Sequence, residues 1–306
     1  MKKCVIIMNP QSGKQKKITT YQGFYDILRE HGYDTDIILT KAKGDAEKII
    51  QSLDKSIDLV ISAGGDGTLN ETVTGNLKRK KPLVLAPLPL GSTNDVGNMY
   101  GLDQDVYNNL KEILEGTQKK VDICYINNTP FVYIACLGDY IDMAYRTPRE
   151  LKAKYGKIAY LIYGTKYFFN KMHHYDIRFK VDGKEYEGTY SFIFISNSSR
   201  IAGQPDVYSN VKLNDNKFEV AMANPKNKKE LLRLFTKIDS MDVKDITEIV
   251  HFQTDNFEIE FKDDLKTSWC IDGEEYNNNS NKFCFKVNQN MKMQIPKENI
   301  HQLFEE

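Results

Sequence analysis

The fold of the first part of the chain is decided by one stretch, Asp58-Leu59-Val60-Ile61-Ser62-Ala63-Gly64-Gly65-Asp66-Gly67-Thr68. Its first six residues predict a buried strand, and a helical pattern begins at about Leu69. Glycines at a strand-to-helix turn let backbone amides approach an anion closely, and the helix N-terminus adds a partial positive charge. The stretch therefore predicts a phosphate-binding turn; a tight turn with Thr68 as the helix N-cap is the alternative.

The same alternation of strand and helix extends on both sides of this stretch. The expected strand and helix pairs are 4–8 with 18–30, 35–40 with 45–53, 58–62 with 69–77, and 83–88 with 106–114. Apolar strands separated by helices of about ten residues predict βαβ units and a parallel sheet covered on both faces. The first part of the chain is therefore expected to be an α/β domain.

After Val121 the pattern changes to alternating, mainly antiparallel β structure. Strands are expected within 121–137, on either side of a turn at Asp182-Gly183 (175–181 and 189–196), within 249–261 and at 282–295. Two helical patterns, 149–171 and 226–239, interrupt them. We therefore expect a second domain that begins near residue 121.

The composition excludes several classes of protein. The 306 residues contain 42 basic and 42 acidic side chains, so no nucleic-acid partner bound by bulk charge is expected. No run approaches the roughly 18 apolar residues of a membrane span, and the apolar segment 4–8 is too short for a signal peptide, which favours a cytoplasmic protein. Five widely spaced cysteines indicate neither a disulfide framework nor a zinc site, and we expect them to be small buried side chains.

Polar loops follow the other expected parallel strands. Residues 9–13 follow the first strand, Thr40 ends the second, and Gly91-Ser92-Thr93-Asn94-Asp95 follows the fourth. Because ligands of open parallel sheets bind at the carboxyl ends of the strands, these loops predict a common nucleotide site. Two familiar loops are excluded: Gly13-Lys14 lacks the rest of a P-loop, and Asn70 replaces the third glycine of a dinucleotide fingerprint.

Three motifs together resemble those of the soluble bacterial diacylglycerol kinases and related lipid kinases. They are Gly64-Gly65-Asp66-Gly67-Thr68-Leu69-Asn70-Glu71, Gly91-Ser92-Thr93-Asn94-Asp95 and Asp272-Gly273-Glu274. The first motif alone is shared with NAD kinases. The resemblance implies a Rossmann-like α/β nucleotide-binding domain (1–121, joined by about 292–306), a C-terminal antiparallel β-sandwich domain for the lipid (122–291), and an interdomain cleft that receives the lipid hydroxyl.

The resemblance also implies the residues that contact ATP, with Asp66 and Asp95 near the phosphates through magnesium. The implied ATP contacts are Asn9, Pro10, Gln11, Ser12, Gly13, Thr40, Gly65, Asp66, Gly67, Thr68, Leu69, Asn70, Glu71, Thr93 and Asp95.

Asp272-Gly273-Glu274 is the expected catalytic motif, because an alcohol is a poor nucleophile until a carboxylate accepts its proton. We favour Glu274 as the proton acceptor, with Asp272 orienting the hydroxyl or the metal. An ordinary hairpin turn at Asp-Gly is the alternative.

A structural magnesium site is implied at Asp215, with Lys212 and Lys217 contributing backbone carbonyls. Asn216 stands where the family often has glycine, so an ordinary turn is the alternative here.

The expected activity is ATP-dependent phosphorylation of diacylglycerol to phosphatidic acid at a membrane surface. Residues 146–171, rich in cations and aromatic side chains, predict an interfacial helix, with a core helix as the alternative, and the basic run 78–81 could steer the protein to anionic lipids. Another lipid alcohol (a sphingoid base or a phosphatidylglycerol-type headgroup), a NAD kinase or a catalytically silent nucleotide-binding regulator are the alternatives. Family members are often dimeric, so a homodimer is possible.

Overall fold

The computed structural model describes residues 1–13, 20–103, 105–138, 172–201, 204–265, 267–277 and 279–305. The expected helix at 149–171 and the basic aromatic stretch 146–171 lie outside these residues. The chain divides into two compact units: unit 1 is Met1–Ile123 with Gln289–Glu306, and unit 2 is Cys124–Asn288. Each unit is described separately below.

Unit 1 is built on a parallel sheet with the strand order β2-β1-β3-β4-β16. The strands are β1 (Lys2–Met8), β2 (Tyr33–Leu39), β3 (Leu59–Gly64), β4 (Leu85–Pro89) and the final part of β16 (Lys282–Ile295). All residues of β3 and β4 are buried, as expected for central strands that helices cover on both faces. Met293 of β16 pairs in parallel with Leu85 of β4, so the end of the chain returns to this sheet.

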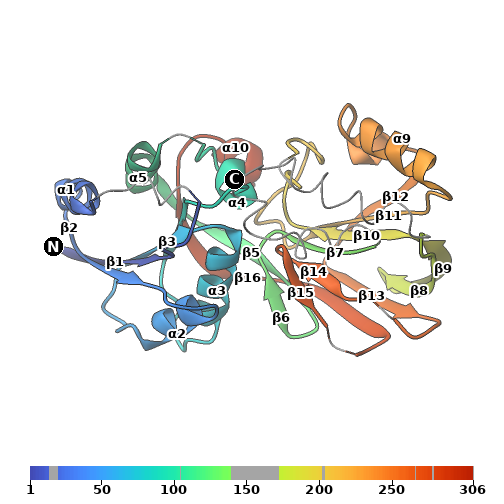
Figure 1. The fold of residues 1–306 in the computed structure, drawn as a ribbon, viewed down its shortest axis with the longest axis horizontal. Coiled ribbons are helices and arrows are strands. Elements are labelled where there is room, and N and C mark those ends of the chain that lie inside the picture. The colour runs from blue at the N-terminus through green and yellow to red at the C-terminus, as the bar shows by residue number, and fades with distance from the viewer. Residues whose placement is uncertain are drawn as a thin grey trace. The chain divides into compact units, whose positions relative to one another are not determined.

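Helices cover both faces of this sheet. In Figure 1, α1 and α5 lie on one face, and α2 and α3 lie on the other. The helices are α1 (Gln22–Glu30), α2 (Asp45–Ser52), α3 (Asp66–Leu77), α4 (Asp95–Met99), α5 (Val106–Leu114) and α10 (Ile300–Leu303). The α/β prediction is confirmed, and α5 has the bounds that the sequence predicts. Helix α3 begins three residues before the predicted start, and the short α4 was not predicted.

Unit 2 consists of two antiparallel sheets that share one core. One sheet has the order β12-β11-β10-β7-β14-β15, and β16, β13, β8 and β9 pair in the other. The strands are β5 (Thr117–Ile126, shared with unit 1), β6 (Thr129–Phe131), β7 (Ile134–Gly138), β8 (Tyr175–Val181), β9 (Lys184–Tyr190), β10 (Phe192–Ser196), β11 (Phe218–Ala223), β12 (Ile249–Thr254), β13 (Asn256–Phe261), β14 (Trp269–Ile271) and β15 (Glu274–Tyr276). The described residues of unit 2 also form helix α9 (Lys228–Ile238) and the 3-10 turn η3 (Val243–Asp245).

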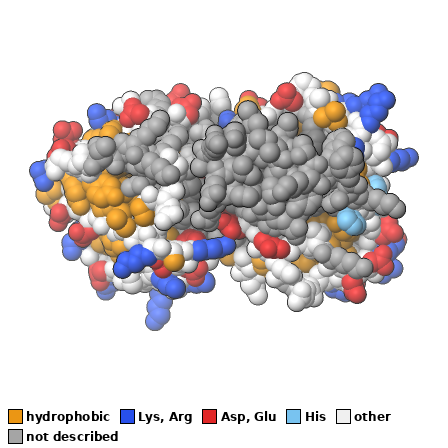
Figure 2. All heavy atoms as spheres, in the orientation of Figure 1, with side chains coloured by type: hydrophobic (Ala, Val, Ile, Leu, Met, Phe, Trp, Pro, Cys, Tyr) orange, Lys and Arg blue, Asp and Glu red, His pale blue; other side chains and the backbone are white. Residues whose placement is uncertain are grey.

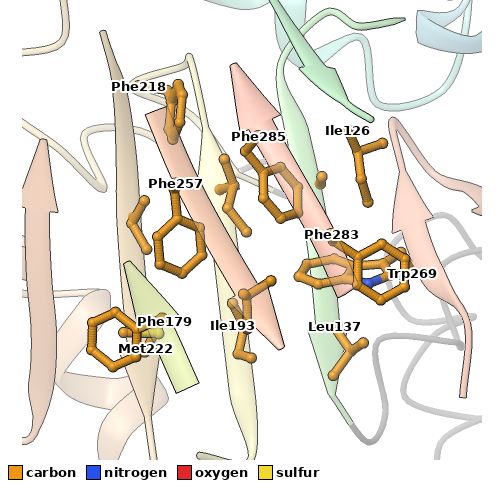
Figure 3. Close-up of a cluster of buried hydrophobic side chains, with 14 of the residues drawn as sticks. Ile126, Leu137, Phe179, Ile193, Phe218, Met222, Phe257, Trp269, Phe283 and Phe285 are labelled. Atoms are coloured by element: carbon orange, nitrogen blue, oxygen red, sulfur yellow. The ribbon is translucent and has the colours of Figure 1, made fainter. Parts of the chain in front are cut away.

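The core of unit 2 lies between its two sheets. Figure 3 shows Phe257 and Phe285, from one sheet, among Ile193, Phe218 and Trp269, from the other. All five side chains are at most 2% exposed. Buried and more exposed residues alternate along β8 and β13, because successive side chains of a strand point to opposite faces of the sheet. The antiparallel fold predicted for the second half of the chain is confirmed.

Two further expectations can be compared with the structure. Four of the five cysteines are buried, as predicted, whereas Cys284 is half-buried; all five are free thiols. Among the described residues, no helix combines the length and the hydropathy that a membrane-spanning segment requires.

Candidate active site

The glycine-rich turn joins β3 to α3 in unit 1. Gly65 is the N-cap of α3, so the alternative with Thr68 as N-cap is wrong: Thr68 lies in the first turn of the helix. Thr68 packs directly on Gly64, where a Cβ atom would lie 2.4 Å from the Thr68 hydroxyl oxygen. The N-cap Gly65 has no side chain of its own to cap α3, and Gly67 in the first turn is half-exposed, so backbone amides of this helix N-terminus can approach an anion.

The loop after β4 lies against the glycine-rich turn. A Cβ atom at Gly91 would lie 2.7 Å from the Cα of Gly65, so the two backbones touch. The Leu90 amide donates to the Gly64 carbonyl at 2.7 Å. Only glycine allows this approach, and the two motifs form one structural element.

Asp66 joins the same two loops through its side chain. Its carboxylate accepts hydrogen bonds from the backbone amides of Asp95 (3.1 Å) and Val96 (3.3 Å), which begin helix α4. A carboxylate at a helix N-terminus satisfies amides that have no partner within the helix. Asp66 is half-buried, whereas Asp95 is fully buried, so Asp66 is the better placed of the two to meet a phosphate or a metal.

The loops after β1 and β2 reach the same edge of the sheet. The Asn9 side-chain amide donates to the Thr68 hydroxyl at 3.3 Å, and a Cβ at Gly13 would lie 3.2 Å from the Ser92 hydroxyl. The Thr40 amide donates to the carbonyl of Met8, the last residue of β1. The structure therefore brings the four sequence-predicted loops together.

The remaining predicted ATP contacts differ in exposure. Ser12 and Leu69 are buried, Gln11 and Gly13 are exposed, and a third group is half-buried: Pro10, Asn70, Glu71 and Thr93. The buried Leu69 side chain belongs to the core of unit 1, so only its backbone is suited to ligand contact.

Glu71 has a structural partner that the sequence did not reveal. Its carboxylate accepts the amides of Gly44 (2.8 Å) and Ala46 (3.3 Å) at the N-terminus of α2. Gly44 is the N-cap of α2 and has no side chain to cap the helix itself. Glu71 therefore supplies the missing cap from α3.

We expect Glu71→Ala to lower the free energy of unfolding by about 1–2 kcal/mol, because two helix-terminal amides lose their acceptor. Glu71→Gln keeps an acceptor oxygen and should lose less. Urea denaturation measures both variants, and the KM for ATP measured in parallel tests direct nucleotide contact. A large rise in KM at unchanged stability would contradict a capping role.

In unit 2, Asp272 and Gly273 form the turn between β14 and β15. Their φ values of 47° and 86° fit the turn that Asp-Gly favours in two-residue hairpins. The Asp272 side chain is only 5% exposed. Its carboxylate accepts the backbone amides of Val132 (2.7 Å), Tyr133 (3.1 Å) and Ile134 (3.0 Å), so it anchors the hairpin to the start of β7.

Glu274 differs from Asp272 in its surroundings. It is the first residue of β15 and its side chain is exposed. The buried Asp272 is held by backbone donors, whereas Glu274 is accessible to a substrate. This arrangement suits Glu274 to proton transfer and Asp272 to positioning the turn on which Glu274 stands.

The turn at Asp215 has a simple local geometry. The Asp215 carboxylate accepts the Lys217 amide at 3.0 Å, and Asn216 between them has a φ of 57°. Asparagine adopts this left-handed conformation readily, so it replaces the family's glycine without disrupting the turn. Within the described ranges, no group of three or more His, Cys, Asp or Glu side chains could hold a metal, so a cation here would depend on Asp215 and carbonyl oxygens, including those of Lys212 and Lys217.

Comparison with known proteins agrees with these motifs. Residues 3–126 match the family model described as the diacylglycerol kinase catalytic domain. Diacylglycerol kinases of Staphylococcus aureus strains RF122 / ET3-1 and MRSA252 are 32% identical over 236 residues, which cover 77% of this chain and 75% of each relative.

Solved structures of similar fold come from Bacillus anthracis. A putative diacylglycerol kinase is 24% identical with a TM-score of 0.80, covering 96% of this chain and 95% of that one. A second such structure is 25% identical with a TM-score of 0.79, covering 96% and 97%. With the motifs, the geometry and the relatives in agreement, the chain belongs to the diacylglycerol kinase family and is a lipid kinase, a phosphotransferase that acts on an alcohol acceptor.

Proposed function

We propose that the protein transfers the γ-phosphoryl group of ATP to the hydroxyl of diacylglycerol, giving phosphatidic acid and ADP, and that it meets its lipid at a membrane surface. The observation that carries this proposal is the contact between the glycine-rich turn and the loop that begins at Gly91, tied by Asp66, at the carboxyl edge of the unit 1 sheet. The exposed carboxylate of Glu274 in unit 2 supplies the chemistry that an alcohol acceptor needs.

The nucleotide would be held by unit 1. The N-terminus of α3, whose N-cap is Gly65, offers backbone amides to a phosphate, and the loops at Asn9–Gly13, Thr40 and Thr93 surround the same edge of the sheet. Bare backbone at Gly65 and Gly67 lets phosphate oxygens approach closely. These features support ATP as the phosphoryl donor.

The family implies a divalent cation, which we propose to be Mg²⁺. Asp66 fits this group, because carboxylate oxygen is the donor that Mg²⁺ prefers and Asp66 is half-buried at the first turn of α3 rather than enclosed in the core. When bound, the cation would neutralise charge on the phosphates. Asp66 would hold it, with Asp95 behind it in the buried part of the loop.

In the proposed reaction, the acceptor oxygen attacks the γ-phosphorus of ATP. The new oxygen–phosphorus bond forms as the bond from the γ-phosphorus to the bridging oxygen breaks, and ADP leaves with that electron pair. The hydroxyl proton passes to a carboxylate oxygen of Glu274. Asp272 holds the turn through its three backbone donors.

The test is phosphoryl transfer from labelled ATP to a panel of acceptors in mixed micelles. The panel contains diacylglycerol, a sphingoid base, phosphatidylglycerol and, as a water-soluble acceptor, NAD. We expect labelled phosphatidic acid from diacylglycerol. Preferential labelling of another lipid would show that this lipid, not diacylglycerol, is the acceptor, and the protein would still be a lipid kinase. Labelling of NAD alone, or of no acceptor, would overturn the proposed reaction.

We also propose a structural Mg²⁺ at the Asp215 turn. Mg²⁺ without ATP should then raise the melting temperature of the protein relative to EDTA, because a ligand that binds only the folded state stabilises it. Asp215→Ala should abolish this shift, and Asn216→Gly, which keeps the carboxylate, should retain it. An equal shift in Asp215→Ala would place the cation elsewhere.

A further inference from the structure

A basic groove opens in unit 1 at the edge of the sheet opposite the glycine-rich turn. It has a volume of about 620 Å³, and its lining runs along 51–55 and 78–81. These segments precede β3 and β4, whereas the nucleotide loops follow the same strands. Because β3 is six residues long and a strand rises about 3.3 Å per residue, the two sites lie roughly 20 Å apart.

The groove concentrates positive charge that the chain as a whole does not have. Its basic lining residues are Lys55, Lys78, Arg79, Lys80 and Lys81, and Asp54 is its one acidic lining residue. The chain has a formal net charge of zero, so this excess is local. In Figure 2, Lys and Arg side chains protrude from the edge of unit 1 that carries α2, the helix that leads into the groove.

Arg79 builds the wall of the groove. Its guanidinium donates to the carbonyls of Ile50 (2.6 Å), Gln51 (3.2 Å) and Leu53 (2.8 Å) at the end of α2. These bonds satisfy carbonyl oxygens that have no hydrogen-bond partner within the helix because they lie at its C-terminus. Arg79 therefore fixes the 78–81 segment against α2. Because Arg79 already occupies the carbonyl oxygens at the end of this helix, the neighbouring lysines are left to bind other acceptors.

Among the residues that the structure describes, three of the lysines have no anionic partner. Lys78 forms an ion pair with Glu47 at 2.6 Å, but within the described part of the chain Lys55, Lys80 and Lys81 pair with no carboxylate. Hydrogen bonds from Ser56 lower the pKa of the Asp54 carboxyl group, so this group stays ionised. It accepts the backbone amide of Ser56. The groove thus presents three exposed ammonium groups on a fixed frame.

We propose that this groove is a second anion site, separate from the nucleotide site, that binds the phosphate group of an organic phosphate ester. Lysine ammonium groups pair with phosphate oxygens as point charges, and a groove of this volume accommodates an ester larger than a bare phosphate ion. The same chemistry is offered by an anionic lipid headgroup and by a soluble sugar or glycerol phosphate. Helix α3 connects the two sites, since it begins at the glycine-rich turn and ends one residue before Lys78.

The test compares the full chain with the double variant Lys80→Glu/Lys81→Glu. The control is Lys111→Glu/Lys120→Glu, which changes the net charge equally at exposed lysines elsewhere in unit 1. Saturating ADP fills the nucleotide site in every arm. Cosedimentation with phosphatidylcholine vesicles, with and without phosphatidic acid, tests the lipid source, and calorimetry with glycerol 3-phosphate tests the soluble source.

We expect phosphate-dependent binding in at least one arm, weakened roughly tenfold or more by the groove variant and much less by the control. Binding should also weaken as salt is raised. Absence of phosphate-dependent binding in both arms, or equal loss in the two variants, would overturn the proposal. The readout is binding rather than turnover, so it is independent of the proposed reaction.

Discussion

Glu274→Gln is expected to lower kcat by about 10²- to 10⁴-fold, the usual contribution of a positioned general base. The amide has nearly the shape of the carboxylate but cannot accept the hydroxyl proton. Because Glu274 is exposed on β15, we expect its replacement to change the melting temperature little. Steady-state kinetics with saturating ATP and diacylglycerol in mixed micelles measures the effect.

Glu275→Gln is the matched control for this variant. Glu275 is the exposed neighbour of Glu274 on β15, and its carboxylate accepts the Ser268 hydroxyl at 2.9 Å. The same chemical change there should leave kcat within about twofold, because surface substitutions away from a site have small effects. Equal losses in the two variants, or no loss in Glu274→Gln, would remove Glu274 from the reaction.

Asp272→Ala should lower the free energy of unfolding by roughly 3–5 kcal/mol, which for a chain of marginal stability is a severe loss. Three backbone amides at Val132, Tyr133 and Ile134 lose a charged acceptor in a buried place. Urea denaturation followed by tryptophan fluorescence suits this measurement, because the single Trp269 lies in β14, next to the turn.

Asp182→Ala provides the comparison. Asp182 occupies the same position of an equivalent turn, with a φ of 50°, but its side chain is exposed. Both variants place alanine in a left-handed conformation, which costs about 1–2 kcal/mol. Asp182→Ala also removes the hydrogen bond that the Asp182 carboxylate accepts from the Thr254 hydroxyl (3.3 Å), so the difference between the variants compares three buried amide bonds with one hydroxyl bond. Equal destabilisation of the two variants would show that the three amide contacts contribute little, and it would contradict the positioning role of Asp272.

The sequence predicts best the features that depend on local patterns. The bounds of β8, α5 and β16 agree with the predicted ones, because apolar periodicity is continuous over each element. Helix α4 was missed because it is five residues long and its N-terminus is satisfied by Asp66, which lies 29 residues earlier in the chain. No local pattern carries that information.

In the candidate site, too, the local motifs could be predicted from the sequence, whereas the long-range partners of the side chains could not. The motifs showed which loops to expect, since strand ends of a parallel sheet meet at one edge. They did not show that Glu71 caps α2 or that the donors to Asp272 lie 138–140 residues before it. These partners arise from tertiary packing, and they separate carboxylates that hold the structure from carboxylates that are accessible to a substrate.

The backbone contact between Gly65 and Gly91 has a consequence for how this protein can vary. Since a Cβ at Gly91 would meet the Gly65 Cα at 2.7 Å and the Asn94 side-chain oxygen at 2.6 Å, no relaxation of one flexible side chain can make room. In a saturation library, Gly91 should therefore tolerate no other residue. The exposed Ser92 beside it should accept many, so selection would act on the spacing of two backbones rather than on the side chains of the loop.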